Sequence, residues 1–92
     1  MNKLEILRKD IDKTDAQLIH LLGKRFALTK KVGQFKANNA TGSIDVEREK
    51  AVLAKWEKLA IKNGVDEILA QKIARLIIDS VVENHDRLKE LE

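Results

Sequence analysis

The sequence has no cysteine and no proline, and it is poor in aromatic residues, with one Trp, two Phe and no Tyr. Without cysteine the chain has no disulfide, no thiolate nucleophile and no cysteine metal site, and its two His residues lie far apart in the sequence. We therefore expect no redox role and no metal or other cofactor. The remaining composition, 36% charged and 43% hydrophobic residues, is typical of a helical protein.

Long hydrophobic runs are also missing. The apolar runs are far shorter than the roughly 20 residues that cross a bilayer, and the N-terminal Met1–Glu5 segment shows no signal-like apolar core. We therefore expect no contact with a membrane and a cytoplasmic protein. Basic and acidic residues, 18 against 15, are interspersed, and stacking aromatics are scarce, so we expect no nucleic-acid binding.

One helix dominates the N-terminal part of the sequence. The residues at alternating steps of three and four from Leu4 to Phe35 are apolar except for Thr14 and Arg25. This pattern predicts a helix over residues 3–38 with a coiled-coil-like seam. Asn2 is placed to cap it, with Glu5 three residues later. Such a helix is about 54 Å long. A rod of this length does not fit a compact monomer of 92 residues, so we expect a homodimer.

Two shorter helices account for the rest of the sequence. The second is expected over residues 45–62, capped by Ser43 or Asp45 and stopped at Gly64. Asp66 caps the third, which continues to the C-terminus with an apolar stripe. The predicted fold class is all-α, a single domain of residues 1–92 built as a three-helix subunit with no strand.

The inner faces of these helices predict the core. Val52, Trp56 and Leu59 form the inner line of the second helix. Phe26 and Phe35 are also best interpreted as core residues.

Two cations share one face of the long helix. Arg25 occupies a seam position, where an unpaired guanidinium is costly and needs an anionic partner. Lys36 follows 11 residues later, on the same face within about 20° and roughly 16 Å along the axis. Together they could hold a small dianion. The alternative is that Arg25 pairs with a nearby Asp or extends outward into solvent.

The start of the second helix places Asp45, Arg48 and Glu49 at positions i, i+3 and i+4, on one surface. These residues either form a cap followed by ordinary helix salt bridges, or a polar cluster aimed at the interior that suits carboxylates and a hydroxyl. Arg8 lies 17 residues before Arg25, about 25 Å away along the helix. It reaches the same ligand only if two long helices pair antiparallel, so that it enters the partner's pocket.

In this order and spacing the motifs resemble the all-helical, type II class of chorismate mutases. The pattern LRxxIDxxDxxLxxLLxxR begins at Leu7, a Lys follows at position 36, and DxxRE begins at Asp45. The resemblance covers essentially the whole sequence without gaps.

The resemblance implies an intertwined homodimer with two pockets, each completed by the partner's first helix. Arg8 of one chain would reach a substrate carboxylate in the other chain's pocket. Within that pocket the resemblance implies that Arg25 binds a carboxylate, Lys36 binds a carboxylate and donates to the ether oxygen, Arg48 sits among these cations, and Asp45 and Glu49 hold the ring hydroxyl.

The third helix departs from the family pattern, which has a Ser and a Gln four residues apart. The ungapped register puts Val81 and His85 at these positions, whereas a shift by one residue would supply Ser80 and Asn84. We favour Val81 and His85. Losing the hydroxyl should weaken carboxylate binding modestly, and the His85 ring could replace the amide as a donor to the ether oxygen.

The implied activity is that of an isomerase of phenylalanine and tyrosine biosynthesis, which converts chorismate into prephenate by an intramolecular rearrangement. It requires no nucleophile or metal, only conformational restraint and electrostatic stabilisation. The residues implied to carry catalysis are Lys36, Arg48, Glu49 and His85. Two alternatives stay open: an isochorismate-pyruvate lyase of the same family, and a helical dimerisation module without chemistry.

Overall fold

The structure is a computed structural model that describes residues 2–38 and 45–91, with all side chains in these ranges except those of residues 37, 38, 85 and 88–91. The regular structure in these ranges is entirely helical. It consists of α1 (Lys3–Asn38), α2 (Val46–Asn63) and α3 (Glu67–Leu91). The predicted all-α class with three helices is therefore confirmed for the described part of the chain.

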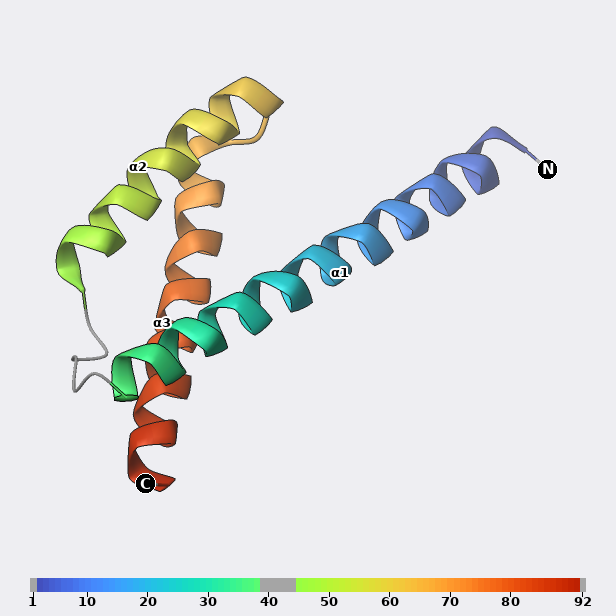
Figure 1. The fold of residues 1–92 in the computed structure, drawn as a ribbon. Helices are drawn as coiled ribbons and strands as arrows, with labels where there is room; N and C mark the ends of the chain where they lie inside the picture. Colours follow the sequence, from blue (N-terminus) through green and yellow to red (C-terminus); the bar gives the residue numbers. More distant parts are fainter. Residues whose placement is uncertain (1, 39–44, 92) are drawn as a thin grey trace.

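Helix α1 is a rod that extends well beyond the other two helices (Figure 1). Asn2 caps its N-terminus as predicted, because the backbone N–H of Glu5 donates to Asn2 Oδ1 at 2.8 Å. The two side chains also meet, with Asn2 Nδ2 donating to Glu5 Oε1 at 3.3 Å. No proline interrupts its 36 residues. The longest dimension of the chain, 56 Å, is close to the length predicted for this helix.

Helices α2 and α3 form a hairpin whose ends follow the predicted signals. Asp45 caps α2 by accepting the backbone N–H of Arg48 at 3.0 Å, and Asp66 caps α3 by accepting that of Leu69 at 2.9 Å. Ser43, the alternative cap of α2, lies outside the described residues. Helix α2 ends at Gly64, whose φ of 69° is left-handed, a conformation that glycine adopts without steric cost.

Two side-chain contacts show the register of this hairpin. Gln71 Nε2 on α3 donates to the Leu53 carbonyl on α2 at 2.8 Å. One helical turn further along α3, Arg75 Nη1 donates to Glu49 Oε1 at 2.7 Å, one turn back along α2. The helices therefore run antiparallel with a fixed alignment. The buried hydrophobic core of the described residues consists of Val52, Ala60, Ala70, Ala74, Ile77 and Ile78.

Helix α3 packs against both α1 and α2, and it crosses α1 near the C-terminal end of that helix (Figure 1). The apolar seam of α1 therefore has little cover from its own chain. Every apolar seam residue is at least 48% exposed. These residues are Leu4, Leu7, Ile11, Leu18, Leu21, Leu28, Val32 and Phe35.

Two expected core residues are exposed. Phe35 is 67% exposed on α1 and Leu59 is 46% exposed on α2. Phe26 and Trp56 are half-buried, and Val52 is buried as predicted. Within the described ranges, no helix is both long enough and apolar enough to cross a membrane.

Replacing Gly64 should destabilise the hairpin. Gly64→Ala places a Cβ on a residue with φ of 69°, and we expect it to lower the free energy of unfolding by about 1 kcal/mol. Gly64→Asn is the matched control, because Asn tolerates this conformation and should cost less. Urea unfolding at one fixed protein concentration measures both. Equal stability of wild type and Gly64→Ala would contradict the assigned helix end.

Candidate functional site

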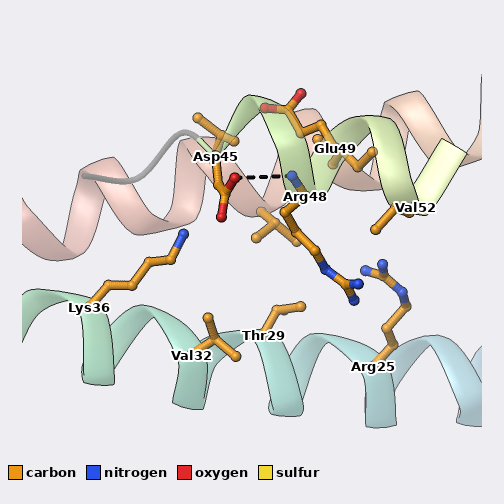
Figure 2. A pocket seen from close by; sticks show the side chains of 11 residues that line it. Arg25, Thr29, Val32, Lys36, Asp45, Arg48, Glu49 and Val52 are labelled. Atoms are coloured by element: carbon orange, nitrogen blue, oxygen red, sulfur yellow. Dashed lines mark hydrogen bonds between the residues drawn. The ribbon is translucent and has the colours of Figure 1, made fainter. Parts of the chain in front are cut away.

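A hollow between the three helices gathers most of the predicted site residues (Figure 2). It encloses about 640 Å³, including space open to solvent. We refer to it as the hollow. Its lining residues are Arg25, Thr29, Val32 and Lys36 on α1, Asp45 at the cap of α2, Arg48, Glu49 and Val52 on α2, and Ile78, Val81 and Val82 on α3.

Helix α1 supplies two of the cations. Arg25 and Lys36 both line the hollow, with Thr29 and Val32 between them, and Figure 2 shows all four side chains directed from α1 toward α2. The 11-residue spacing brings these two cations to one face, as the sequence predicted. Both are half-buried, so their charges lie partly out of bulk water.

The first turn of α2 supplies the third cation. Asp45 accepts the backbone N–H of Arg48, and the Arg48 side chain extends toward α1, near the end of Arg25 (Figure 2). Asp45 also lines the hollow. The sequence left two roles open for Asp45, a helix cap or part of a polar cluster at the site. Asp45 has both positions in the structure, because the cap fixes where α2 begins.

The cations of the hollow are not neutralised within the described part of the chain. No salt bridge between described residues includes Arg25, Lys36 or Arg48; those present are Lys50–Glu47, Arg75–Glu49, Arg75–Asp79 and Arg87–Glu83. The pairing of Arg25 with a nearby Asp is thus not observed. Three like charges facing one space favour an anionic ligand there. Arg48 is exposed, but Arg25 and Lys36 are half-buried, so solvent screens their charges less than it screens exposed ones.

Glu49 is the second carboxylate at the hollow, and its partner comes from α3. Glu49 lines the hollow, but its carboxylate turns away from the three cations (Figure 2) and binds Arg75. The pKa of Arg75 is raised, first by its hydrogen bond to Glu49 and then by that to Asp79. Arg75 is therefore charged at every pH at which the fold is expected to work.

Helix α3 closes the hollow with apolar side chains. Ile78, Val81 and Val82 line it, whereas Ser80 and Asn84 are not among its lining residues. The described geometry thus places the favoured Val81 at the hollow. The side chain of His85 lies outside the described residues, so its predicted position stays a prediction.

Arg8 is not part of the hollow of its own chain. It is exposed near the N-terminal end of α1, about 25 Å along the axis from Arg25 at 1.5 Å per residue. This agrees with the argument that one helix cannot bring both residues to the same ligand.

Several residues at the site were not singled out from the sequence. Thr29 could have been, since it lies four residues after Arg25 and seven before Lys36 on the same face; its hydroxyl donates to the Phe26 carbonyl at 3.0 Å. Val82 needed the helix packing. Arg75 carried no local signal, because its partner Glu49 lies 26 residues away in the sequence.

Known proteins with similar sequences share one activity in their names. Over 79 residues the chain is 33% identical to the chorismate mutase of Methanocaldococcus jannaschii. The matched segment covers 86% of this chain and 80% of that protein. It is 31% and 32% identical, over 87 residues, to the bifunctional chorismate mutase/prephenate dehydratases of Buchnera aphidicola from Schizaphis graminum and from Acyrthosiphon pisum.

The two bifunctional relatives are much longer proteins. Each match covers 95% of this chain but 23% of the relative's length. Among family models, that of chorismate mutase type II matches residues 7–86. This range includes α2, most of α1 and α3, and every residue that lines the hollow. By this match, the chain belongs to the chorismate mutase type II family.

Proposed function

We propose that the hollow binds chorismate and converts it into prephenate by an intramolecular [3,3] rearrangement, the isomerase step of phenylalanine and tyrosine biosynthesis. The observation that carries this proposal is the set of three cations, Arg25, Lys36 and Arg48, that line the hollow without a salt bridge to a described residue. Chorismate carries two carboxylates, so it provides the opposite charge. The family match supports the choice of substrate.

The site residues suit this reaction because it needs restraint and charge stabilisation rather than a nucleophile. Arg25 and Arg48 converge on one region of the hollow (Figure 2), and we assign a carboxylate to them. Lys36 binds the other end and donates to the ether oxygen, where negative charge develops as its bond to carbon breaks. Holding the enolpyruvyl arm over the ring removes much of the entropic barrier.

The remaining residues orient the ring. We assign Asp45 and Glu49 to its hydroxyl, because both residues line the hollow from the start of α2. The apolar wall of Ile78, Val81 and Val82 keeps water from one side of the reacting bonds, which strengthens the electrostatic interactions there. His85 stays in the proposal as a second donor to the ether oxygen, on the resemblance alone.

We further propose that the working unit is an intertwined homodimer. The exposed apolar seam of α1 is a large apolar surface of the kind that marks a protein interface, and a second copy provides a matching seam. In an antiparallel arrangement Arg8 of one chain reaches the hollow of its partner and adds a fourth cation. A symmetric dimer has two such shared sites.

Incubating the purified protein with chorismate, and separately with isochorismate, tests the activity. We expect prephenate from chorismate. Salicylate plus pyruvate from isochorismate, with no prephenate from chorismate, would instead identify a lyase. No conversion of either compound would overturn the proposed activity in favour of a module without chemistry.

Removing the donor assigned to the ether oxygen should slow the reaction. For Lys36→Ala we expect kcat to fall by about 10²-fold or more, by analogy with the loss of a single oxyanion donor. Lys31→Ala is the matched control, since Lys31 is an exposed lysine of the same helix and does not line the hollow. Steady-state kinetics on chorismate decides; near-normal turnover of Lys36→Ala would contradict the role given to this residue.

Mixing two inactive variants tests whether the sites are shared between chains. Arg8→Ala and Lys36→Ala homodimers should each have little activity. The two variants are then unfolded and refolded together, so that about half of the dimers are hybrids. Each hybrid has one intact site and one doubly altered site. Roughly a quarter of wild-type activity should therefore return. If activity stays at the level of the separate variants, Arg8 does not act across the dimer.

A further inference from the structure

Arg75 lies behind the hollow and binds one of its lining residues. It does not line the hollow itself, but Arg75 Nη1 donates to Glu49 Oε1 at 2.7 Å. The Glu49 side chain is 20% exposed, against 45% for Arg75. This contact joins a carboxylate at the site to a cation on a different helix, and it is short enough for a charge-assisted hydrogen bond.

The fold fixes this contact from two sides. The hydrogen bond from Gln71 to the Leu53 carbonyl sets the register of α2 and α3, which brings Arg75 opposite Glu49 one turn away. On its own helix, Arg75 also donates to Asp79 at 3.4 Å, four residues further on. Both bonds come from Nη1, so this nitrogen lies between two carboxylates, with the shorter bond going to Glu49.

The contact has two consequences for Glu49. An ionised carboxylate offers about four acceptor positions, so a bond to Oε1 leaves capacity to accept a hydroxyl from a ligand. In addition, a carboxylate held by α3 is kept from turning toward Arg25 and Arg48, which would neutralise the charges that attract the substrate.

We propose that Arg75 is a positioning residue of the site, which holds Glu49 at the rim of the hollow so that the carboxylate can accept the substrate hydroxyl while Arg25 and Arg48 stay available for a substrate carboxylate. This inference rests on the proposed mutase activity of the hollow. It assigns Arg75 an effect on turnover that passes entirely through Glu49.

The competing interpretation is a structural one, in which the contact only ties α3 to α2. Gln71 provides the matched control, because its hydrogen bond also joins these helices and Gln71 does not line the hollow. Gln71→Ala should reduce stability without changing kcat/KM for chorismate. Arg75→Ala should lower kcat/KM about tenfold, as expected when a binding group loses its orientation.

A double-mutant cycle with Glu49→Ala separates the two interpretations. If Arg75 acts through Glu49, Arg75→Ala should have almost no further effect on kcat/KM in the Glu49→Ala background. The same loss in both backgrounds, an increase of activity in Arg75→Ala, or an equal loss in Gln71→Ala would each overturn the proposal. Thermal unfolding and helical circular dichroism of every variant show that the chains compared are folded.

Arg75→Lys provides a second variant with a retained charge. The ammonium still donates to a carboxylate, so we expect a smaller loss of kcat/KM than in Arg75→Ala, and an equal loss would count against the proposal. Wild-type protein that does not convert chorismate would overturn the proposed function. Wild-type turnover with an unchanged Arg75→Ala variant would overturn this inference alone.

Discussion

The site depends on one constraint: three cations face the same partly buried space, and none of them has a salt bridge to another described residue. Arg25 and Lys36 are brought together by spacing along α1, and Arg48 is added by the cap that begins α2. The two carboxylates nearby are already engaged, since Asp45 accepts a backbone N–H and Glu49 binds Arg75. A ligand with two negative charges therefore relieves a repulsion that the fold itself maintains.

The shape of the subunit follows from the same helix that carries two of these cations. Helix α1 is long enough to place Arg25 and Lys36 beside α2 and α3 and still extend far beyond them (Figure 1). The buried core among the residues whose side chains are described is correspondingly small, and three of its six hydrophobic residues are alanines. The exposed apolar seam of α1 is a surface that a single chain does not bury. We therefore expect dimer assembly and formation of the site to depend on the same helix, α1.

The sequence predicted the features that arise within a helix, whereas several features that arise between helices needed the structure. The caps at Asn2, Asp45 and Asp66 and the stop at Gly64 are local, as is the face shared by Arg25 and Lys36, and the structure confirms them. The exposure of Phe35 and Leu59 depends on which faces other helices cover. The Arg75–Glu49 contact depends on the hairpin register, and no spacing within one helix reveals it.

The central claim is that the hollow is built for a compact, doubly charged guest, and calorimetric titration with a rigid bicyclic ether dicarboxylate, shaped like the rearranging substrate, tests it most directly. We predict one binding site per chain and an affinity at least 10²-fold above that of a flexible dicarboxylate such as succinate, since a site complementary to the transition state favours its shape. No binding, or equal binding of the rigid and flexible compounds, would contradict the account.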